Sequence, residues 1–403
     1  MVPPVGQHQV DVSPFSCGVA VQVVFVDGVA TRASVAAAAA ALPPGATLAH
    51  LSALSPQQAA AVLRPLAAGH PSAAFDALNA VCCSDPLCLL LPPGLSADHV
   101  PLHLLHVSAS TAGPGLDSLP CAQPRVLVHL GAGAAATLVE EFTCTPAVAT
   151  AAAAAAAASS KAPAPVCAVN ACFHAALEAK AVLTHGRVSL LSGAVPQVGL
   201  TTVAQAEGSS YSLTSGCVAG MLSRHDVSIT QGGPATSTSQ QAFVLAAGSS
   251  AAGEVHTRLL LDHPDGVAKQ LHKCIAAVPG AKCVFNGGVT LHRAAQRTDA
   301  QQLSRALLLA PRATVHAKPT LQINADDVKC SHGCSVADLS GDELFYFMAR
   351  GIDAAAARDA LVYSFAAEVV DQLPAAVAPV TARLKAAIRA ELAVAQQQVK
   401  DRA

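Results

Sequence analysis

The chain has 403 residues, of which 52% are hydrophobic and only 3% aromatic, with no tryptophan. Lys and Arg number 24 against 26 Asp and Glu, and there is no basic run or basic-aromatic stripe, which argues against a nucleic-acid partner. The most apolar runs, Val35 to Leu42 and Ala151 to Ala158, are far shorter than the roughly 18–20 residues of a membrane helix, so we expect no membrane partner. A core with so few rings must be built from Val, Leu, Ile and Ala, which suits regular, repeated layers.

The cysteines indicate a reducing compartment. There are 13 of them, an odd number, and no secretory signal follows Met1. Most lie in apolar stretches, as Cys82, Cys88 and Cys274 do, and we expect these to be buried, reduced thiols.

Residues 1–120 predict a mixed region of helices and strands. Phe25 to Gly28 reads as a strand that runs into a tight turn. Ser55 to Leu66 predicts a helix, because a serine start is followed by Pro56 and apolar spacing. Ala73 to Ala80 predicts a second, short helix.

Residues 121–335 predict a β-rich core. Short runs of Val, Leu, Ile and Thr recur between turn residues: Arg125–Leu130, Thr137–Phe142, Arg187–Leu191, Ala242–Ala246, Thr257–Asp262, Cys283–Phe285, Val289–His292, Ala306–Leu309 and Thr320–Ile323. Such runs are typical of a sandwich, a barrel or a β-solenoid, and no clean hexapeptide or nonapeptide repeat chooses among them. A short helix is open for the alanine-rich stretch 147–165, but its composition favours a solvated insertion or linker.

Residues 336–403 predict a helical region. Ser340 to Glu343 fits a capping box, and Gly351 is expected to end the helix that follows. Asp353 is a good N-cap for the next helix, which should run to about Leu373. A last helix is expected over roughly 380–399.

One short segment carries candidate ligands. In an extended strand, residues i and i+2 point to the same side, so Cys330 and His332 should project together. Thiolate and imidazole suit zinc and iron–sulfur clusters. The pattern alone leaves open whether Cys334 joins that face.

A lone Cys-x-His pair is more often structural than metal-binding. A zinc ion or cluster takes four ligands as a rule, the chain has no CxxC pair, and the other nearby histidine is the more distant His316. A real site would need another chain to complete it. Two other groups read as structural: His103 with His106, and the run 224–226, a charge cluster at a strand edge. No GxxxxGK[ST], GxSxG or HExxH motif occurs, so we expect no nucleotide bound or hydrolysed by this chain.

The same segment closely resembles a known family. Residues 318–333 read KPTLQINADDVKCSHG and are similar to the signature of the SufD branch of the SufB/SufD family of iron–sulfur cluster assembly scaffolds. DELFYF at 342–347, ARGI at 349–352 and YSFAAE at 363–368 are similar to its following helices. Looser matches occur in order upstream, at Val26–Gly28, Phe75–Asn79, Pro92–Gly94, Pro101–His103, Val139–Glu141, Val284–Gly287 and Gln296–Ala300.

The resemblance implies a right-handed parallel β-helix, mainly β, with the mixed N-terminal region and the C-terminal helical domain at its ends. It implies a scaffold rather than an enzyme, in a SufB–SufC–SufD complex of the SUF system. The transient iron–sulfur cluster would form at the interface with the homologous SufB, with Cys330 and His332 as cofactor and metal ligands. The SufC ATPase would dock on the C-terminal helices.

The chain departs from the family pattern in three places. Only about two dozen residues precede the first strand, which suggests a truncated or processed N-terminus. The family's TNRNLLL appears as Leu303 to Leu309, and Cys334 stands where the family has alanine. The alanine-rich insertion favours a nuclear-encoded protein of the chloroplast stroma, with a bacterial cytoplasm as the alternative; no transit peptide is visible.

Two other functions remain open from the sequence. One is a β-helix enzyme acting on a polysaccharide, which needs clustered carboxylates. The acidic neighbours Glu140 with Glu141, and Asp326 with Asp327, should point to opposite faces of a strand and therefore make poor acid/base pairs. The other is a purely structural subunit in which Cys330 and His332 are merely packed.

Overall fold

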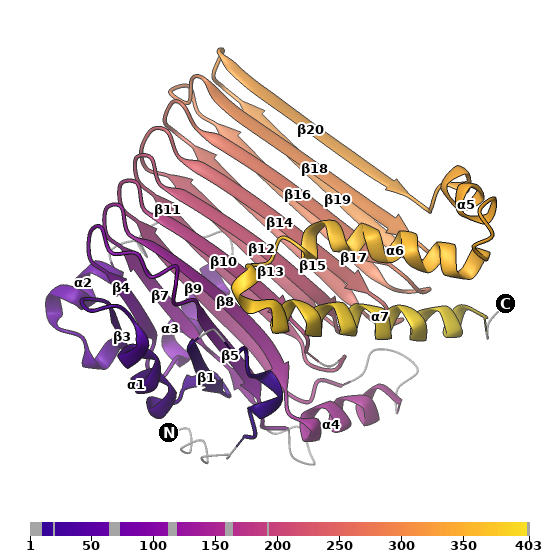
Figure 1. The fold of residues 1–403 in the computed structure, drawn as a ribbon, viewed down its shortest axis with the longest axis horizontal. Helices are drawn as coiled ribbons and strands as arrows, with labels where there is room; N and C mark the ends of the chain where they lie inside the picture. Colours follow the sequence, from indigo (N-terminus) through magenta and orange to yellow (C-terminus); the bar gives the residue numbers. More distant parts are fainter. Residues whose placement is uncertain are drawn as a thin grey trace.

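A computed structural model describes residues 10–18, 21–63, 73–111, 119–157, 164–191 and 193–400. Two large β-sheets form its body (Figure 1). Sheet A contains, in spatial order, β2 (Val29–Ala30), β1 (Val21–Val26), β5 (Leu102–Ser108), β8 (Ala135–Cys144), β10 (Val182–Ser189), β12 (Ser210–Ala219), β14 (Ser237–Ala246), β16 (Val267–Ala276), β18 (Thr298–Leu308) and β20 (Val328–Ala337). Sheet B contains β19 (Thr314–Ile323), β17 (Lys282–Leu291), β15 (Ala252–Leu261), β13 (Ser223–Gln231), β11 (Gln197–Gln205), β9 (Ala168–Leu177), β7 (Arg125–Leu130), β4 (Leu87–Leu91) and β3 (Thr47–His50), with β6 (Cys121–Ala122) beside β9.

The chain alternates between the two sheets and so winds a parallel β-solenoid. Each strand pairs in parallel with the strand one coil later; Ser237 pairs with Val267, which in turn pairs with Asp299. Among the described strands, only the short pairings of β1 with β2 and of β3 with β4 are antiparallel. The parallel β-helix expected from the resemblance is therefore confirmed, and the sandwich and barrel are excluded.

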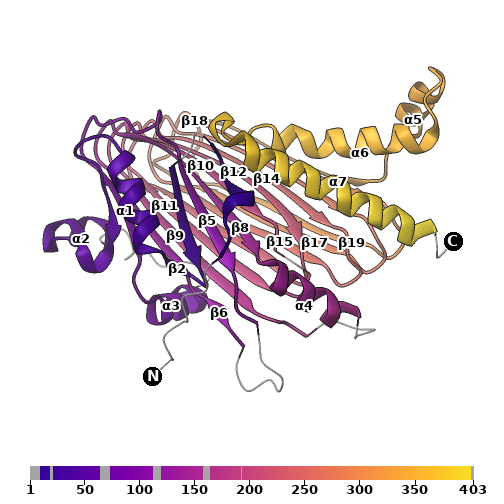
Figure 2. The ribbon, with the colours of Figure 1, turned by 60° about the horizontal axis from the view of Figure 1, so that its bottom comes forward.

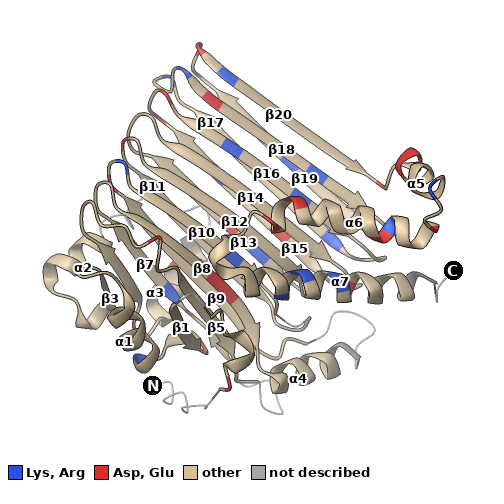
Figure 3. Cartoon of the chain, viewed as in Figure 1, with Lys and Arg blue, Asp and Glu red and all other residues tan. Residues whose placement is uncertain are grey.

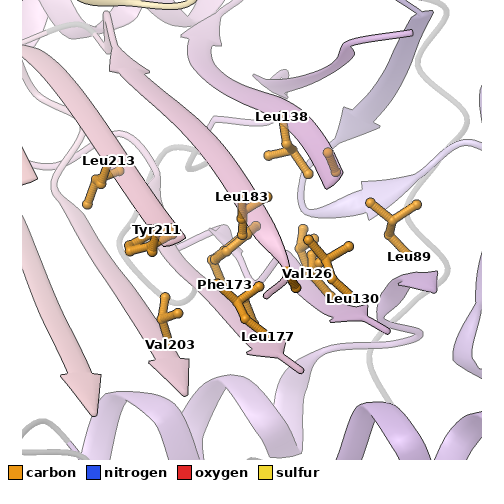
Figure 4. Close-up of a cluster of buried hydrophobic side chains, with 14 of the residues drawn as sticks. Leu89, Val126, Leu130, Leu138, Phe173, Leu177, Leu183, Val203, Tyr211 and Leu213 are labelled. Carbon is orange, nitrogen blue, oxygen red and sulfur yellow. The ribbon is translucent and has the colours of Figure 1, made fainter. Parts of the chain in front are cut away.

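The space between the sheets holds an aliphatic core. Alternate residues of each strand point inward, so the side chains of successive coils stack in columns. Figure 4 shows part of this cluster, in which Leu138, Leu183 and Leu213 of sheet A face Phe173 and Val203 of sheet B. Small and branched side chains fill the layers, as the composition indicated.

The strands begin well before residue 121. β1 and β5 continue sheet A, and β4 continues sheet B, so residues 21–108 already contribute to the solenoid. The expected division of the chain at residues 120 and 335 stays a prediction. The turn after β1 has the expected form, because Asp27 and Gly28 have φ angles of 49° and 89°.

Helices accompany the first coils: α1 (Arg32–Ala41), α2 (Pro56–Leu63), α3 (Ala73–Cys82) and α4 (Pro146–Ala157), with 3-10 turns at Ser13–Phe15 and Leu51–Ala53. The last residues of the helix expected over 55–66 lie outside the described residues. The linker expected over 147–165 is wrong in its first part. α4 forms there because Val148 is buried in an apolar cluster with Phe142, and Ala152 is buried as well, a tertiary environment that the composition does not reveal.

Three helices follow the solenoid: α5 (Gly341–Met348), α6 (Ala354–Val370) and, after a 3-10 turn at Ala375–Val377, α7 (Ala378–Lys400). Figures 1 and 2 show α6 and α7 lying across the outer face of sheet A. Asp353 caps α6 as expected, accepting from the amides of Ala355 and Ala356, and Gly351 has a φ of 81°. The capping box at Ser340 is wrong, because its side chain makes no capping hydrogen bond and α5 begins there without it.

The apolar sides of α6 and α7 are used inside this chain. Val369, Leu384 and Ile388 are buried in one cluster with Val139 and Val188 of sheet A. Gly216 permits the close approach, because a Cβ there would lie 2.3 Å from Leu384 Cδ2. The helices therefore close one face of the solenoid.

No single helix of the described chain has the length and apolar character to cross a membrane; α6 together with segment 375–398 passes the test only as a pair bent by 119°. Acidic and basic side chains are interspersed over the view of Figure 3. All thirteen cysteines are free, and those that are buried are Cys17, Cys88, Cys167, Cys172, Cys274 and Cys283. Cys82, which was expected to be buried, is exposed at the end of α3.

Candidate metal-binding site at the open end of the solenoid

The two sheets end in the strands β19 and β20. Each is the terminal strand of its sheet and, within the described residues, pairs on one side only. Figure 1 shows β20 at the edge farthest from the N-terminal elements. Unpaired strand edges expose backbone N–H and C=O groups that can pair with another chain.

Cys330 and His332 lie on β20 and point toward the inside of the solenoid. Cys330 is half-buried, packs against the inner core and pairs with Ala300, which is itself buried. His332 pairs with Gln302, whose side chain is 3% exposed. The shared face expected from strand geometry is therefore present, and it is accessible because no further coil covers it.

Cys334 belongs to the same face. Its register partner is Ser304, which is 1% exposed, so Cys334 continues the inward row of β20 by two residues. Its side chain is exposed. Thus three residues with ligating atoms line one strip of the terminal strand.

His316 does not join this strip. It is exposed on β19, and its neighbour Val315 packs against an apolar cluster, so the His316 side chain points to the outer face of sheet B. His316 is near Cys330 and His332 in sequence, but its side chain lies on a different face of the solenoid.

The two candidate ligands differ in their surroundings. Burial raises the pKa of the Cys330 thiol, so a metal binding there displaces a proton. His332 is exposed and makes no hydrogen bond or ion pair with the described residues. The outer side of this part of β20 borders a hollow of about 720 Å³, whose wall includes Glu368 of α6 and Gln372 just after that helix.

Within the described residues, Cys330 and His332 belong to no group of three or more ligating side chains with mutually close atoms. A metal or cluster bound at this end therefore requires ligand atoms from another molecule. The unpaired edges of β19 and β20 are the natural place for that molecule to approach.

In the part of the chain that the structure describes, one such group occurs, formed by Asp76 of α3 with Cys172 and His174 of β9. Arg125 pairs with Asp76 at 2.9 Å, and His174 Nε2 lies 3.2 Å from the same carboxylate oxygen. His174 and Arg125 hold the pKa of Asp76 well below its usual range. Since Arg125 already neutralises the carboxylate, these contacts fasten α3 to sheet B.

Two buried carboxylates were missed as structural groups by the sequence analysis. Glu140 faces inward, with its oxygens 3.4 Å from His106 Nε2 and 3.2 Å from His185 Nε2. Glu141 faces outward and lies 2.9 Å from His103 Nε2. The expectation that these two acids point to opposite faces is correct, and His103 and His106 are core residues with acidic partners.

The outer face of sheet B offers a second, polar hollow of about 370 Å³, lined among others by Arg224, Asp226, His256 and Arg258. Its carboxylate, Asp226, accepts two hydrogen bonds of 2.9 Å from Arg224. This hollow therefore lacks the pair of carboxylates that glycoside hydrolysis uses.

The chain is similar in sequence to a family model and to several known proteins. Residues 112–365 match the family model of the SUF system FeS cluster assembly SufBD core domain. The chain is 37% identical over 300 residues to the chloroplastic protein ABCI7 of Arabidopsis thaliana, a match that covers 74% of this chain and 59% of that protein. It is 34% identical over 302 residues to an iron–sulfur cluster assembly SufBD family protein of Synechocystis, covering 75% of this chain and 63% of the relative.

A shorter match involves the iron–sulfur cluster assembly protein SufD of Escherichia coli, 41% identical over 119 residues, or 29% of this chain and 28% of that protein. The chain thus spans about six-tenths of the length of the plant and cyanobacterial relatives.

Proposed function

The chain belongs to the SufBD family of SUF-system iron–sulfur cluster assembly proteins, and on this premise we propose that it is the SufD-like scaffold subunit of a SufB–SufC–SufD complex. It binds no nucleotide itself and catalyses no reaction. The cluster is cargo that forms between this chain and SufB and then leaves. Cys330 and His332 are the ligands that this chain contributes.

The single observation that carries the proposal is the position of these two residues. They lie on the inward face of an uncovered terminal strand, beside two unpaired sheet edges. A homologous solenoid can extend both sheets across those edges through backbone hydrogen bonds, as strand addition does in other complexes. Thiolate and imidazole from this side would then meet ligands from SufB.

The SufC ATPase is proposed to bind the C-terminal helices through α5. The apolar faces of α6 and α7 are already packed on sheet A, whereas Phe345, Tyr346 and Met348 of α5 are 72%, 57% and 50% exposed. Exposed aromatic and Met side chains in one short helix are typical of protein interfaces.

The plastid stroma is the proposed compartment. It rests on the chloroplastic relative from Arabidopsis, with the cytoplasm as the alternative. Imaging a tagged full-length gene product in its source cells decides between them.

Anaerobic reconstitution with SufB and SufC tests the proposal. His332→Ala should assemble the complex but reduce iron and sulfide per complex, because alanine offers no ligand atom. His332→Cys should retain more, since a thiolate is also an iron ligand. His316→Ala is the matched control, an exposed imidazole on the neighbouring terminal strand whose loss should change nothing. Normal clusters in the His332→Ala complex would show that this chain is a purely structural subunit.

A further inference from the structure

Three glutamines from successive coils form a hydrogen-bonded column inside the solenoid. Gln240, Gln270 and Gln302 are register partners on β14, β16 and β18, and each is at most 5% exposed. Gln302 Nε2 donates to Gln270 Oε1 at 2.5 Å, and Gln270 Nε2 donates to Gln240 Oε1 at 2.8 Å. The amides therefore run head to tail, with each N–H group directed to the preceding coil and each carbonyl left for the next one.

The column ends at Gln302 with one group unused. Gln302 Oε1 is buried and has no hydrogen-bond partner within the described residues, and a buried carbonyl without a partner is destabilising because it has lost its hydrogen bonds to water. The amide cannot turn its nitrogen outward without losing the bond to Gln270. Gly287 leaves it the necessary space, because a Cβ there would lie 2.6 Å from Gln302 Nε2. The last carbonyl is thus fixed, facing the final coil.

His332 occupies the next position of the column. It is the register partner of Gln302 on β20, where a fourth amide would stand if the ladder continued. A neutral imidazole has one N–H donor and one nitrogen with a free lone pair. The side chain is exposed and has no hydrogen bond or ion pair with the described residues, so rotation toward Gln302 breaks none.

We propose that Gln302 is the positioning residue of His332: its Oε1 accepts the N–H of one ring nitrogen, which leaves the lone pair of the opposite nitrogen directed outward for a borderline metal such as ferrous iron. The inference rests on the proposed function, because it concerns the same imidazole. The inference adds Gln302 to the proposed site as a residue that contacts neither the metal nor the partner chain.

The chemistry of metal-binding histidines supports this arrangement. Such a histidine donates its second ring N–H to an oxygen of the protein, which fixes both tautomer and ring orientation, and loss of that oxygen weakens metal binding by about 10–100-fold. An exposed imidazole on an edge strand would otherwise rotate freely. The buried glutamine column supplies a rigid acceptor that the surface of the strand lacks.

The tautomer of His332 in the isolated, full chain is the direct test. Nitrogen-15 spectra of histidine-labelled protein identify the His332 signals as those absent from His332→Ala. The wild type should show a single tautomer, and Gln302→Met, which keeps the volume and removes the acceptor, should show both. Gln301→Met is the control, because Gln301 is exposed on the opposite face of the same strand and bonds to Asp299 instead. An unchanged single tautomer in Gln302→Met overturns the inference.

If Gln302→Met does not fold, a second variant still tests the inference. Gln302→Glu keeps an acceptor oxygen at the same place, so His332 should retain its single tautomer; a mixture in this variant overturns the inference as well. In the reconstituted complex, Gln302→Met should lower bound iron about 10-fold, and should have no further effect when combined with His332→Ala.

The two hypotheses fail separately. If His332→Ala leaves cluster formation intact, the proposed function is wrong whatever the tautomer. If His332→Ala abolishes cluster formation while Gln302→Met changes neither tautomer nor iron content, only the role of Gln302 is wrong.

Discussion

Arg383 of α7 donates two hydrogen bonds, of 2.7 and 2.6 Å, to the carboxylate of Glu141 on β8. Glu141 is fully buried, and burial alone would raise its pKa, but Arg383 and His103 hold it below the usual value. The carboxylate is therefore charged beneath the helix. This ion pair joins the C-terminal helical layer to one of the first coils of the solenoid.

Removing Arg383 should destabilise the chain. Arg383→Ala leaves a buried carboxylate with His103 alone, and breaking one partner of a buried pair costs about 3–5 kcal/mol; because Arg383 is partly exposed, we expect about 3 kcal/mol in urea unfolding. Arg389→Ala on the same helix is the control. Arg389 only stacks on Tyr363 at 4.2 Å, so its loss should cost about 0.5–1 kcal/mol. Equal effects of the two substitutions would contradict the assigned role.

The contact of α7 with β12 depends on Gly216. Gly216→Ala places a Cβ against Leu384 and should cost about 1–3 kcal/mol by overpacking. Combined with Leu384→Ala, it should cost less than the sum of the two single changes, because the cavity accepts the new methyl group. Gly193→Ala, which meets no atom within 4 Å, is the control. Additive losses in the double variant would show that the two residues are not in contact.

His272 should make the stability depend on pH. Burial lowers its pKa to about 3 from 6.5, and the ring stacks on Phe285 at 4.3 Å. The unfolded chain therefore binds a proton below pH 6.5 that the folded chain does not. The stability contributed by the neutral ring is complete above pH 6.5 and falls with decreasing pH, by about 1.4 kcal/mol per unit, down to about pH 3.

The replacement His272→Gln isolates this effect. The difference in unfolding free energy between wild type and variant, measured from pH 7 to 4.5, should shift in favour of the variant as the pH falls. A difference that stays constant over this range would mean that folding does not shift the pKa of His272.

The sequence predicted those parts of the solenoid whose strands are apolar. Arg125–Leu130 coincides with β7, because the run is both apolar and bounded by turn residues. For β14, the sequence predicted only the apolar half, 242–246. The polar half does not look like a buried strand, because the burial of Gln240 depends on a hydrogen bond from Gln270 one coil away. Such a contact becomes visible only when the register of the coils is known.

In the candidate site, too, some residues are recognisable from the local sequence and others only from the register of the coils. Cys330 and His332 could be found from a local motif, whereas Gln302 carries no local signal and is identified by its place in a column of side chains. A helix at α4 was the less favoured alternative for a related reason, because its stability depends on the burial of Val148 and Ala152.

Replacing the candidate ligands should impair metal binding but change the unfolding free energy only slightly. His332 is exposed and unpartnered, so His332→Ala should change the unfolding free energy by less than about 1 kcal/mol. Cys330 packs on the inner core, and Cys330→Ala should cost about 1 kcal/mol. Urea unfolding of the isolated chain measures both. A loss above about 2 kcal/mol for His332→Ala would assign the histidine a structural role and remove it from the proposed site.

The exposed side chains of α5 should bind SufC. Phe345 and Met348, 72% and 50% exposed, lie three residues apart and so share one face of the helix. Apolar anchors of this kind contribute about 2 kcal/mol or more each when they fill a partner's pocket. The double change Phe345→Ser and Met348→Ser should therefore weaken SufC binding at least about 10-fold in titration calorimetry, while the circular dichroism spectrum and the unfolding midpoint remain those of the wild type. Val394→Ser is the matched control, since Val394 of α7 is 52% exposed but lies on another helix. If the double variant binds SufC as tightly as the control does, the ATPase docks elsewhere on this chain.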